Sequence, residues 1–306
     1  MNNGAKRCGG PAYWPDDACM LAFDTATSAM TAAVLRGGRP VRESFFRAER
    51  NHSIRLVPAL RDLLADAGVD VRDLAAVAVG VGPGSYTGVR IGVTVAKTMA
   101  WSLGLPAVAV STLSALAWRG RRLALGAGGP DAGRLWVVPV LDARRGRVYT
   151  GLYASEGDGG DLHDPARWTA VRPDGVRPVA EWLDEVKALA DSAASSRAIV
   201  RVVFVGDVAP VEQAVAERFG SRPGESPKHR ESRPTAEAAV RADVLAADVS
   251  AVDVGELAWA KARRGQIASA HDLVPNYTQL SEAEKKWLAA RGGAADGSAV
   301  AENADV

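Results

Sequence analysis

The 306-residue sequence contains only two cysteines, and both, Cys8 and Cys19, lie near its N-terminus. Two cysteines are too few for a disulfide framework, so the pattern is typical of a protein of the reducing cytosol. Long apolar runs are also missing, which excludes a membrane-spanning helix. The formal net charge is only +1, so no excess charge of one sign indicates binding to nucleic acid or to a membrane surface. We therefore expect a cytoplasmic globular protein without membrane partners.

Histidine is scarce as well. The sequence has four histidines, and they are scattered without the spacing of metal ligands. Structural and catalytic metal sites are built from clustered histidine, cysteine and acidic side chains. We therefore expect neither a metal site nor a metal cofactor.

The stretch VGVGPGSYTGVRIGV, residues 79–93, lies between an apolar run and a helix-like run, where phosphate-binding loops are often found. A Walker-type loop requires a lysine at the start of the helix, and none is present there. A Rossmann fingerprint requires an acidic residue after the next strand, but the strand predicted at 106–110 is followed by Ser111 and Thr112. A third interpretation is an actin-like or sugar-kinase-like fold, in which backbone N–H groups hold an anion without a lysine.

In that third interpretation, an acidic hairpin turn and a glycine turn face one cleft. The residues that fit a nucleotide-binding loop of this kind are Asp24, Thr25, Gly82, Gly84 and Ser85. Two questions stay open from the sequence. The glycines can instead serve close backbone packing without a ligand, and Asp24 can cap backbone N–H groups rather than associate with magnesium.

The chain divides into two halves of similar pattern. VPVLDARRGRVYTGL repeats the order seen in LAFDTATSAMTAAVL, which is an apolar strand, an aspartate, a short polar turn and a second apolar strand. We predict a flexible leader, an N-terminal half, a linker, a C-terminal half and a disordered tail, with bounds 1–18, 19–122, 123–133, 134–290 and 291–306. Periodicity predicts further strands and helices, including helices at 51–67, 87–103, 179–189, 211–219, 235–247 and 252–264.

Three stretches, in this order and spacing, resemble the TsaB (YeaZ) family: LAFDTATSA, NHSIRLVPALRDLL, and the run VGVGPGSYTGVRIGV that continues through VSTLSALA. GPGSYTGVRIG is the most specific of these motifs. The resemblance continues through LDARRGRVYTGLY and VFVGDVA and weakens at LVPNY. The family's usual ending, P-x-Y-L-R, is replaced here by Pro275-Asn276-Tyr277-Thr278-Gln279, which leaves the role of that terminus open.

The resemblance implies an α/β protein with an actin-like ATPase (ASKHA) fold, made of two related βα halves of which the second is smaller and degenerate. It implies a subunit that supports a TsaD-like transferase in making threonylcarbamoyladenosine at adenosine 37 of tRNA, with a TsaE-like ATPase as third member and tRNA bound through the complex. The metal-binding histidines of TsaD fall here at Thr112 and Leu116, and leucine has no ligand atom. The expectation is a pseudo-enzyme without catalytic residues or a resident cofactor, with weak nucleotide binding left open.

The helix predicted at 87–103 carries small residues at every fourth position: Gly88, Gly92, Ala96 and Ala100. Glycine in a helix interior costs about 1 kcal/mol relative to alanine, so close packing is the expected compensation. The resemblance implies that this helix and the one before it form the partner face, with contacts from His52, Ile54, Val57, Leu60 and Arg90 as well. A further hypothesis is that the same face pairs with itself in a homodimer. The alternative is that the small residues pack against the protein's own sheet.

Two rival functions also stay open. One is a small-molecule kinase or ATPase of the actin-like group, with nucleotide held by Asp24 and the loop at 82–85. The other is direct tRNA binding by a basic patch composed of Arg119, Arg121, Arg122, Arg144, Arg145 and Arg147.

Overall fold

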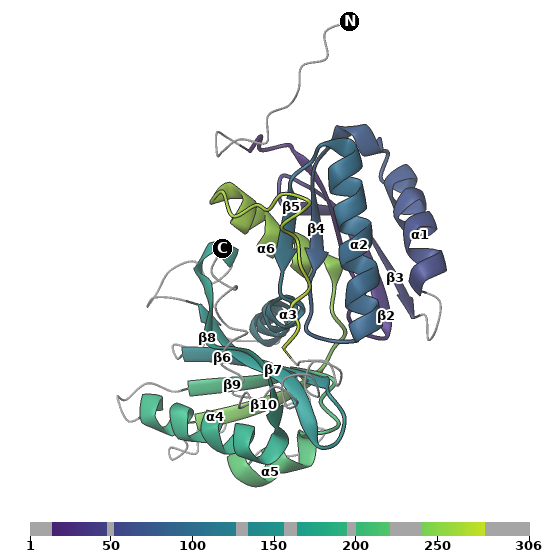
Figure 1. Ribbon diagram of the computed structural model, residues 1–306. Coiled ribbons are helices and arrows are strands. Elements are labelled where there is room, and N and C mark those ends of the chain that lie inside the picture. The colour runs from purple at the N-terminus through teal and green to yellow at the C-terminus, as the bar shows by residue number, and fades with distance from the viewer. Residues whose placement is uncertain are drawn as a thin grey trace, which may run out of the picture.

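The computed structural model describes residues 14–47, 52–126, 134–155, 164–194, 200–220 and 240–278. These residues form two lobes, each built on its own sheet (Figure 1). The predicted tail at 291–306 and most of the predicted leader and linker lie outside the described residues.

The first lobe contains a five-stranded sheet in the order β3-β2-β1-β4-β5. Strand β1 is antiparallel to β2 and parallel to β4, so the predicted opening hairpin is present. All six residues of β1, CMLAFD, are buried, because helices cover both faces of this sheet. The strands are β1 (Cys19–Asp24), β2 (Ala29–Arg36), β3 (Arg39–Arg47), β4 (Leu74–Gly80) and β5 (Ala107–Val110).

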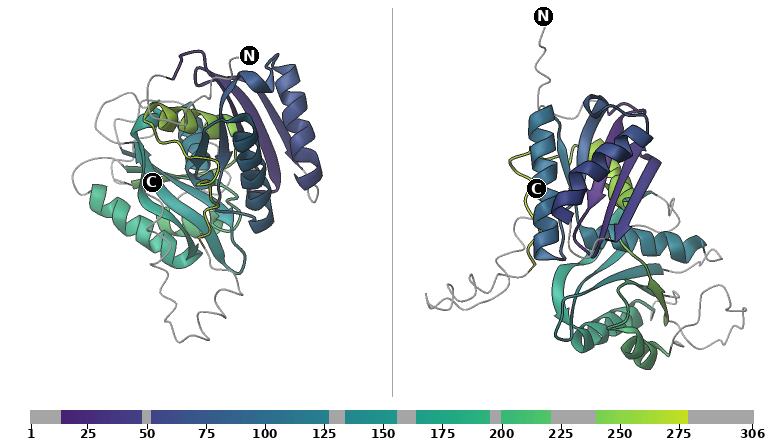
Figure 2. Two further views of the ribbon diagram at one scale, coloured as in Figure 1. Left: turned by 45° about the horizontal axis from the view of Figure 1, so that its top comes forward. Right: turned by 90° about the vertical axis from the view of Figure 1, so that its right-hand side faces the viewer.

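Helices α1 (His52–Asp66) and α2 (Tyr86–Leu103) cover one face of the first sheet, and α6 (Ala251–Arg263) covers the other (Figures 1 and 2). Ser85 caps the start of α2 by accepting a hydrogen bond from the Gly88 N–H. Gly104 ends the helix in the left-handed conformation, the usual helix stop. A short 3-10 helix, η1 (Val71–Asp73), precedes β4.

The second lobe repeats the first. When the strands of each lobe are numbered along the chain, they lie side by side in the order third, second, first, fourth, fifth. In the second lobe this order is β8-β7-β6-β9-β10. The predicted duplication is therefore confirmed. One of its helices is much shorter, since α5 spans 8 residues whereas α2, at the same place in the first lobe, spans 18. The elements are β6 (Arg134–Asp142), β7 (Arg147–Ser155), η2 (Pro165–Arg167), β8 (Trp168–Pro178), α4 (Val179–Ala194), β9 (Val200–Gly206), α5 (Glu212–Phe219) and β10 (Val240–Ala246).

Helix α3 (Thr112–Gly126) connects the lobes. It packs against the second sheet on one side and against α6 on the other. Trp118 of α3 is buried at this junction, edge-on to Trp168, which in turn stacks on Tyr153. Three apolar clusters result: one under α1 and α2, one between the two sheets, and one under α4 and α5.

Several predicted bounds and elements differ from the structure. The helix predicted at 235–247 is wrong, because Val240–Ala246 is strand β10 and pairs in parallel with β9. The alanine-rich sequence favours a helix, but the free edge of the buried strand β9 offers a full ladder of hydrogen bonds. Strand β8 was not predicted. Helix α3 continues to Gly126, four residues into the predicted linker.

The ends of the predicted halves also differ. Trp14, in the predicted flexible leader, packs edge-on against Trp259 with ring centroids 6.0 Å apart. Helix α6 lies in the predicted C-terminal half but contacts the first sheet. The following segment, Gln266–Tyr277, is called the strap here. It pairs with β5 at Ala268 and continues past α2 to the junction of the lobes, as the yellow trace in Figure 1 shows.

Candidate functional site

The glycine loop lies directly on the turn of the first hairpin. The Ser85 N–H donates to the Ala26 carbonyl over 2.7 Å, and the Thr25 hydroxyl donates to the Gly88 carbonyl over 2.7 Å. A Cβ atom on Gly84 would overlap the Ala26 carbonyl oxygen, so glycine is required by this close approach. The loop and the turn thus use one another as hydrogen-bond partners.

The carboxylate of Asp24 is fully engaged inside the first lobe. Its Oδ1 accepts from the Ala26 N–H over 2.7 Å, and its Oδ2 accepts from the Thr112 hydroxyl over 2.6 Å. Burial raises the pKa of Asp24, and these two hydrogen bonds oppose the rise. Of the two roles left open by the sequence, the structure therefore shows the capping role.

Thr112 and Leu116, the positions that the resemblance predicts to match metal-binding histidines of TsaD, lie in the interior. Thr112 donates to Asp24 and accepts from the Gly82 N–H over 3.1 Å. Leu116 is fully buried, and its Cδ2 lies 2.7 Å from where a Cβ on Gly206 would be. Both side chains pack the junction of α3 with the lobes. Among the described residues, no cluster of three histidine, cysteine or acidic side chains has the geometry of a metal site.

The stripe of small residues on α2 faces inward, so its assignment to the partner interface is corrected. Gly88, Gly92, Ala96 and Ala100 are buried within the chain itself. A Cβ on Gly92 would lie 2.5 Å from the Thr25 hydroxyl oxygen, and one on Gly88 would overlap the Thr25 carbonyl. The small residues let α2 approach the hairpin turn of its own sheet, as the alternative interpretation held.

Leu60 is corrected for the same reason. It is 2 % exposed and belongs to the apolar cluster between α1 and the sheet. The side chain of His52, at the first residue of α1, lies outside the described residues. Neither residue therefore supports the predicted partner interface.

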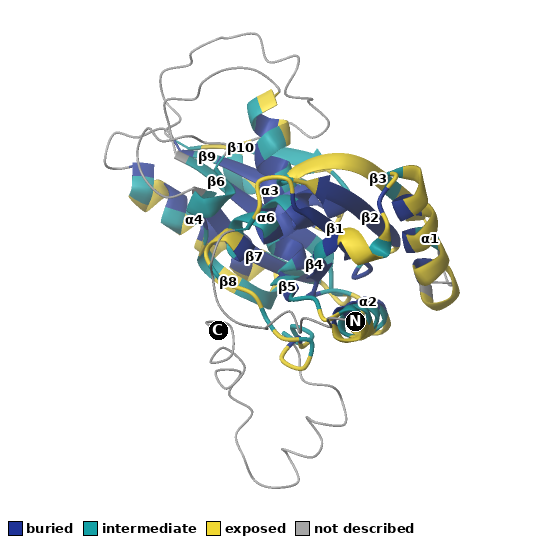
Figure 3. Cartoon of the chain, turned by 90° about the horizontal axis from the view of Figure 1, so that it is seen from above, coloured by how far each residue is buried: buried dark blue, intermediate teal, exposed yellow. Residues whose placement is uncertain are grey.

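The outward side of the two helices does carry apolar side chains. Ile54 and Val57 on α1 are 69 % and 56 % exposed, and Trp101 on α2 is 68 % exposed. Arg90 and Tyr86 of α2 are also exposed. Helices α1 and α2 contact one another, and Figure 3 shows exposed positions on both of them. We call Ile54, Val57, Tyr86, Arg90 and Trp101 the α1–α2 face.

A second polar cluster joins the two lobes. Asp174 of β8 accepts hydrogen bonds from Ser111 (2.5 Å), from the Tyr153 hydroxyl, and from the Asn276 side-chain amide (3.3 Å). Burial raises the pKa of Asp174 and that of Tyr153. We call these four residues the junction cluster. Sequence reasoning missed it, because its members lie on four separate elements and form no local motif.

The predicted basic patch divides into separate parts. Arg121 is buried, with its guanidinium 4.8 Å from the Trp118 ring centroid. Arg122 lies 2.7 Å from the buried carboxylate of Asp253, and Arg119 lies 3.7 Å from it. Only Arg144 and Arg145, at the tip of the β6–β7 hairpin, are exposed and adjacent. The six arginines therefore do not form one surface.

Comparison with known proteins identifies the lineage. The family described as TsaD, tRNA N6-adenosine threonylcarbamoyltransferase, matches residues 46–287. The chain is 36 % identical over 272 residues to the tRNA threonylcarbamoyladenosine biosynthesis protein TsaB of Bacillus subtilis, which covers 88 % of this chain and 97 % of that protein. The chain belongs to the TsaB family. TsaB of Escherichia coli is 37 % identical over 143 residues, 46 % of this chain and 57 % of that protein.

A solved structure of the TsaB family agrees with the fold. YeaZ from Pseudomonas aeruginosa superposes with a TM-score of 0.60 at 28 % identity, covering 85 % of this chain and 99 % of that one. Together with the repeated strand order of the two lobes, this likeness confirms the predicted actin-like α/β fold. None of the helices in the described ranges combines the length and apolar character that crossing a bilayer requires.

Proposed function

We propose that the chain is a non-catalytic subunit that binds and supports a TsaD-like transferase in the threonylcarbamoylation of adenosine 37 of tRNA. The observation that carries this proposal is the 36 % identity to a named TsaB over 97 % of its length. The absence of catalysis is supported by residue chemistry. The resemblance predicts that Thr112 and Leu116 occupy the metal-ligand positions of TsaD, and leucine has no ligand atom to offer.

The partner surface in this proposal is the α1–α2 face. Exposed large apolar side chains that gather on one side of a lobe mark interaction sites more often than scattered ones do. Trp101 and Arg90 are of the residue types that dominate binding energies at protein interfaces. The same face serves a homodimer when the partner is absent, while a TsaE-like ATPase and tRNA join through the complex.

The rival function, a kinase or ATPase, requires a nucleotide between Asp24 and the glycine loop. Both Asp24 carboxylate oxygens are engaged, and the Ser85 N–H is bonded to Ala26. We therefore propose that no nucleotide is resident there. Calorimetry of MgATP with the isolated chain checks this point, and micromolar binding accompanied by turnover would favour the rival.

Reconstitution tests the proposal as a whole. A purified TsaD-like protein, a TsaE-like ATPase, unmodified tRNA and the precursors of the modification are incubated with and without this chain. Threonylcarbamoyladenosine is expected only when both the chain and the TsaD-like protein are present. Equal yields without the chain, or modification by the chain in the absence of the TsaD-like protein, contradict the proposal.

A further inference from the structure

We propose that Tyr277 of the strap completes the α1–α2 face. We further propose that contact between the two lobes at the junction cluster holds Tyr277 in its position on that face. The inference rests on the proposed function, since it concerns regulation of the same partner surface. Tyr277 and Asn276 are adjacent in the chain. Tyr277 contacts exposed residues of α2, and Asn276 contacts the second lobe.

Tyr277 holds two residues of the α1–α2 face. The Arg90 Nε donates to the Tyr277 hydroxyl over 2.8 Å, and the Tyr277 ring lies 5.3 Å from that of Tyr86. The Arg90 guanidinium lies 4.3 Å from the Tyr86 ring centroid and 5.8 Å from the Tyr277 ring centroid. An arginine that is hydrogen-bonded to one tyrosine and packed beside two tyrosine rings loses much of its rotamer freedom before any partner arrives, which lowers the entropic cost of binding.

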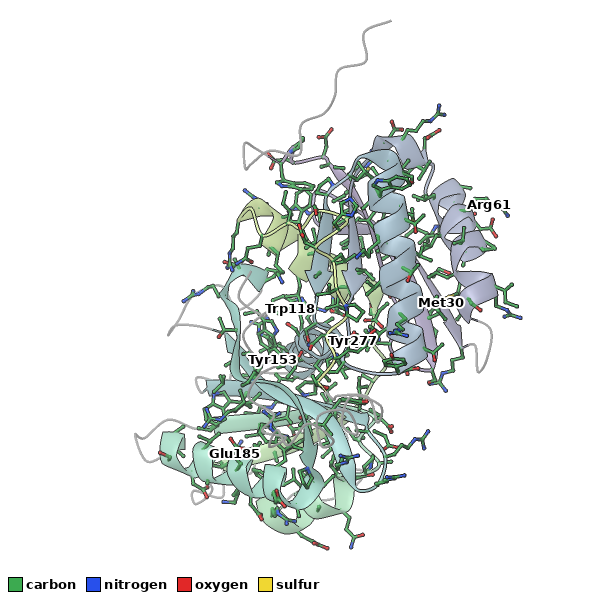
Figure 4. The ribbon with its side chains drawn as sticks, viewed as in Figure 1. Met30, Arg61, Trp118, Tyr153, Glu185 and Tyr277 are labelled. Atoms are coloured by element: carbon green, nitrogen blue, oxygen red, sulfur yellow. The ribbon has the colours of Figure 1, made fainter. Side chains whose placement is uncertain are left out.

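Asn276 connects the strap to both lobes. Its backbone N–H donates to the Val81 carbonyl of the first lobe over 2.8 Å, and its side-chain amide donates to Asp174 of the second lobe over 3.3 Å. Figure 4 shows Tyr277 near the end of α2 that faces the second lobe, and Tyr153 of the junction cluster across the boundary.

The upstream part of the strap is fixed to the first lobe. Ala268 pairs with Ala107 of β5, Lys97 of α2 donates to the His271 carbonyl over 3.2 Å, and Leu273 is buried in the cluster under α2. Within the described strap, Asn276 provides the side-chain hydrogen bond to the second lobe. A relative movement of the lobes therefore pulls on the last two residues and leaves the upstream strap in place.

The junction cluster makes this link depend on lobe position. Asp174 accepts one hydrogen bond from its own lobe, from Tyr153 of β7, and two from outside it, from Ser111 and from the strap, so it has all three only when the lobes are in contact. If the lobes part, Asp174 loses the hydrogen bonds from Ser111 and from the Asn276 side chain together, and Asn276 keeps only its backbone hydrogen bond to Val81, so Tyr277 is held less firmly. Closure of the lobes thus orders Arg90 and Tyr86 for the partner.

A first test uses the full-length chain without a partner. Hydrogen exchange is measured at the Asn276 N–H in the wild type, in Asp174→Asn and in Glu185→Gln. Glu185→Gln removes an ion pair with Arg172 that lies on the same lobe and does not touch the strap. We expect exchange at least about tenfold faster in Asp174→Asn and unchanged in the control. Equal protection in the wild type and Asp174→Asn would overturn the link.

A second test measures the Kd for a TsaD-like protein. Tyr277→Phe removes the acceptor of the Arg90 hydrogen bond and keeps the ring, so binding should weaken about three- to tenfold. Asn276→Ala, at a half-buried side chain, should weaken binding by a similar factor, although it leaves Tyr277 intact. In the double variant the two losses should not multiply, because both act through the same residue.

The outcomes of the second test are distinct. Wild-type Kd for Asn276→Ala, together with weakened binding by Tyr277→Phe, would make Tyr277 a simple contact and overturn the link. Asn276→Ala also keeps the test available if Asp174→Asn does not fold. Val57→Glu addresses the proposed function separately: unchanged binding of that variant contradicts the partner face, while the exchange test still decides the link.

Discussion

The two sides of α2 differ in a way that separates folding from binding. The inner side, with Gly88 and Gly92, touches the hairpin turn of its own sheet so closely that a methyl group would not fit. The outer side carries Trp101, which is 68 % exposed, and Arg90, which packs beside the rings of Tyr86 and Tyr277. A regular four-residue spacing of small side chains thus reports internal packing here, and the exposed large side chains report the candidate partner surface.

The largest effect is expected on the inner side. Gly92→Leu introduces a side chain whose Cβ would lie 2.5 Å from the Thr25 hydroxyl oxygen, with the Val79 side chain also in contact. We expect the free energy of unfolding to fall by about 3 kcal/mol or more. Chemical denaturation followed by circular dichroism measures the loss. A variant that remains as stable as the wild type contradicts the packing described here.

A smaller loss is expected where the inner packing meets Asp24. Thr112→Val keeps the shape of the side chain but removes the donor to Asp24 and the acceptor of the Gly82 N–H. Leaving these buried groups unpaired should lower the free energy of unfolding by about 2 kcal/mol. Thr98→Val, on the exposed side of α2, is the control, and its unfolding midpoint should stay near that of the wild type.

On the opposite face of the sheet, α6 contains a buried acid whose titration affects stability. Burial raises the pKa of Asp253 from its ordinary value of 3.8 to about 7, although Arg122 and Arg119 oppose the rise and Glu256 and Glu43 add to it. Between pH 4 and 7 the folded chain holds a proton that the unfolded chain has released. The free energy of unfolding therefore falls as the pH rises through this window.

Asp253→Asn checks this effect by removing the titrating group. Across pH 4 to 8, the wild type should lose more stability than the variant does, by more than about 1 kcal/mol. Parallel pH dependences in the two proteins would show that Asp253 ionises near its ordinary pKa.

The smallest change in stability is expected on the outer side. Trp101→Glu replaces a side chain that is mostly in solvent, so the free energy of unfolding should change by less than about 0.5 kcal/mol. The same substitution should weaken binding of a TsaD-like protein by at least about tenfold. Leu123 is also an exposed apolar residue, but it lies on α3, away from the α1–α2 face. Leu123→Glu therefore serves as the matched control and should bind as the wild type does.

Much of the fold could be predicted from local pattern. The LAFD and VPVL runs give strands that end at an aspartate, and the glycine loop gives the start of α2. Long-range pairing decided the rest. Val240–Ala246 becomes a strand only because β9 offers it a parallel partner, and β8 has no regular alternation of buried and exposed residues.

The sequence predicted which two helices carry the candidate site, but it did not predict which side of each helix faces outward. Ile54, Val57 and Arg90 are exposed, whereas Leu60 and the four small residues of α2 are buried. Helical spacing places residues on one side of a helix but does not say whether that side meets the protein's own sheet or solvent. The contact between Asp174 and Asn276 could not be predicted from the sequence. The two residues are 102 positions apart, and only the packing of the two lobes brings them together.

The central claim is that the outer side of α1 and α2 binds a TsaD-like protein. It is tested most directly by isothermal titration of that protein with the wild type and with the double variant Val57→Glu/Trp101→Glu. We expect a Kd at least about a hundredfold weaker for a double variant that retains the wild-type unfolding midpoint. A wild-type Kd for the folded double variant would contradict it.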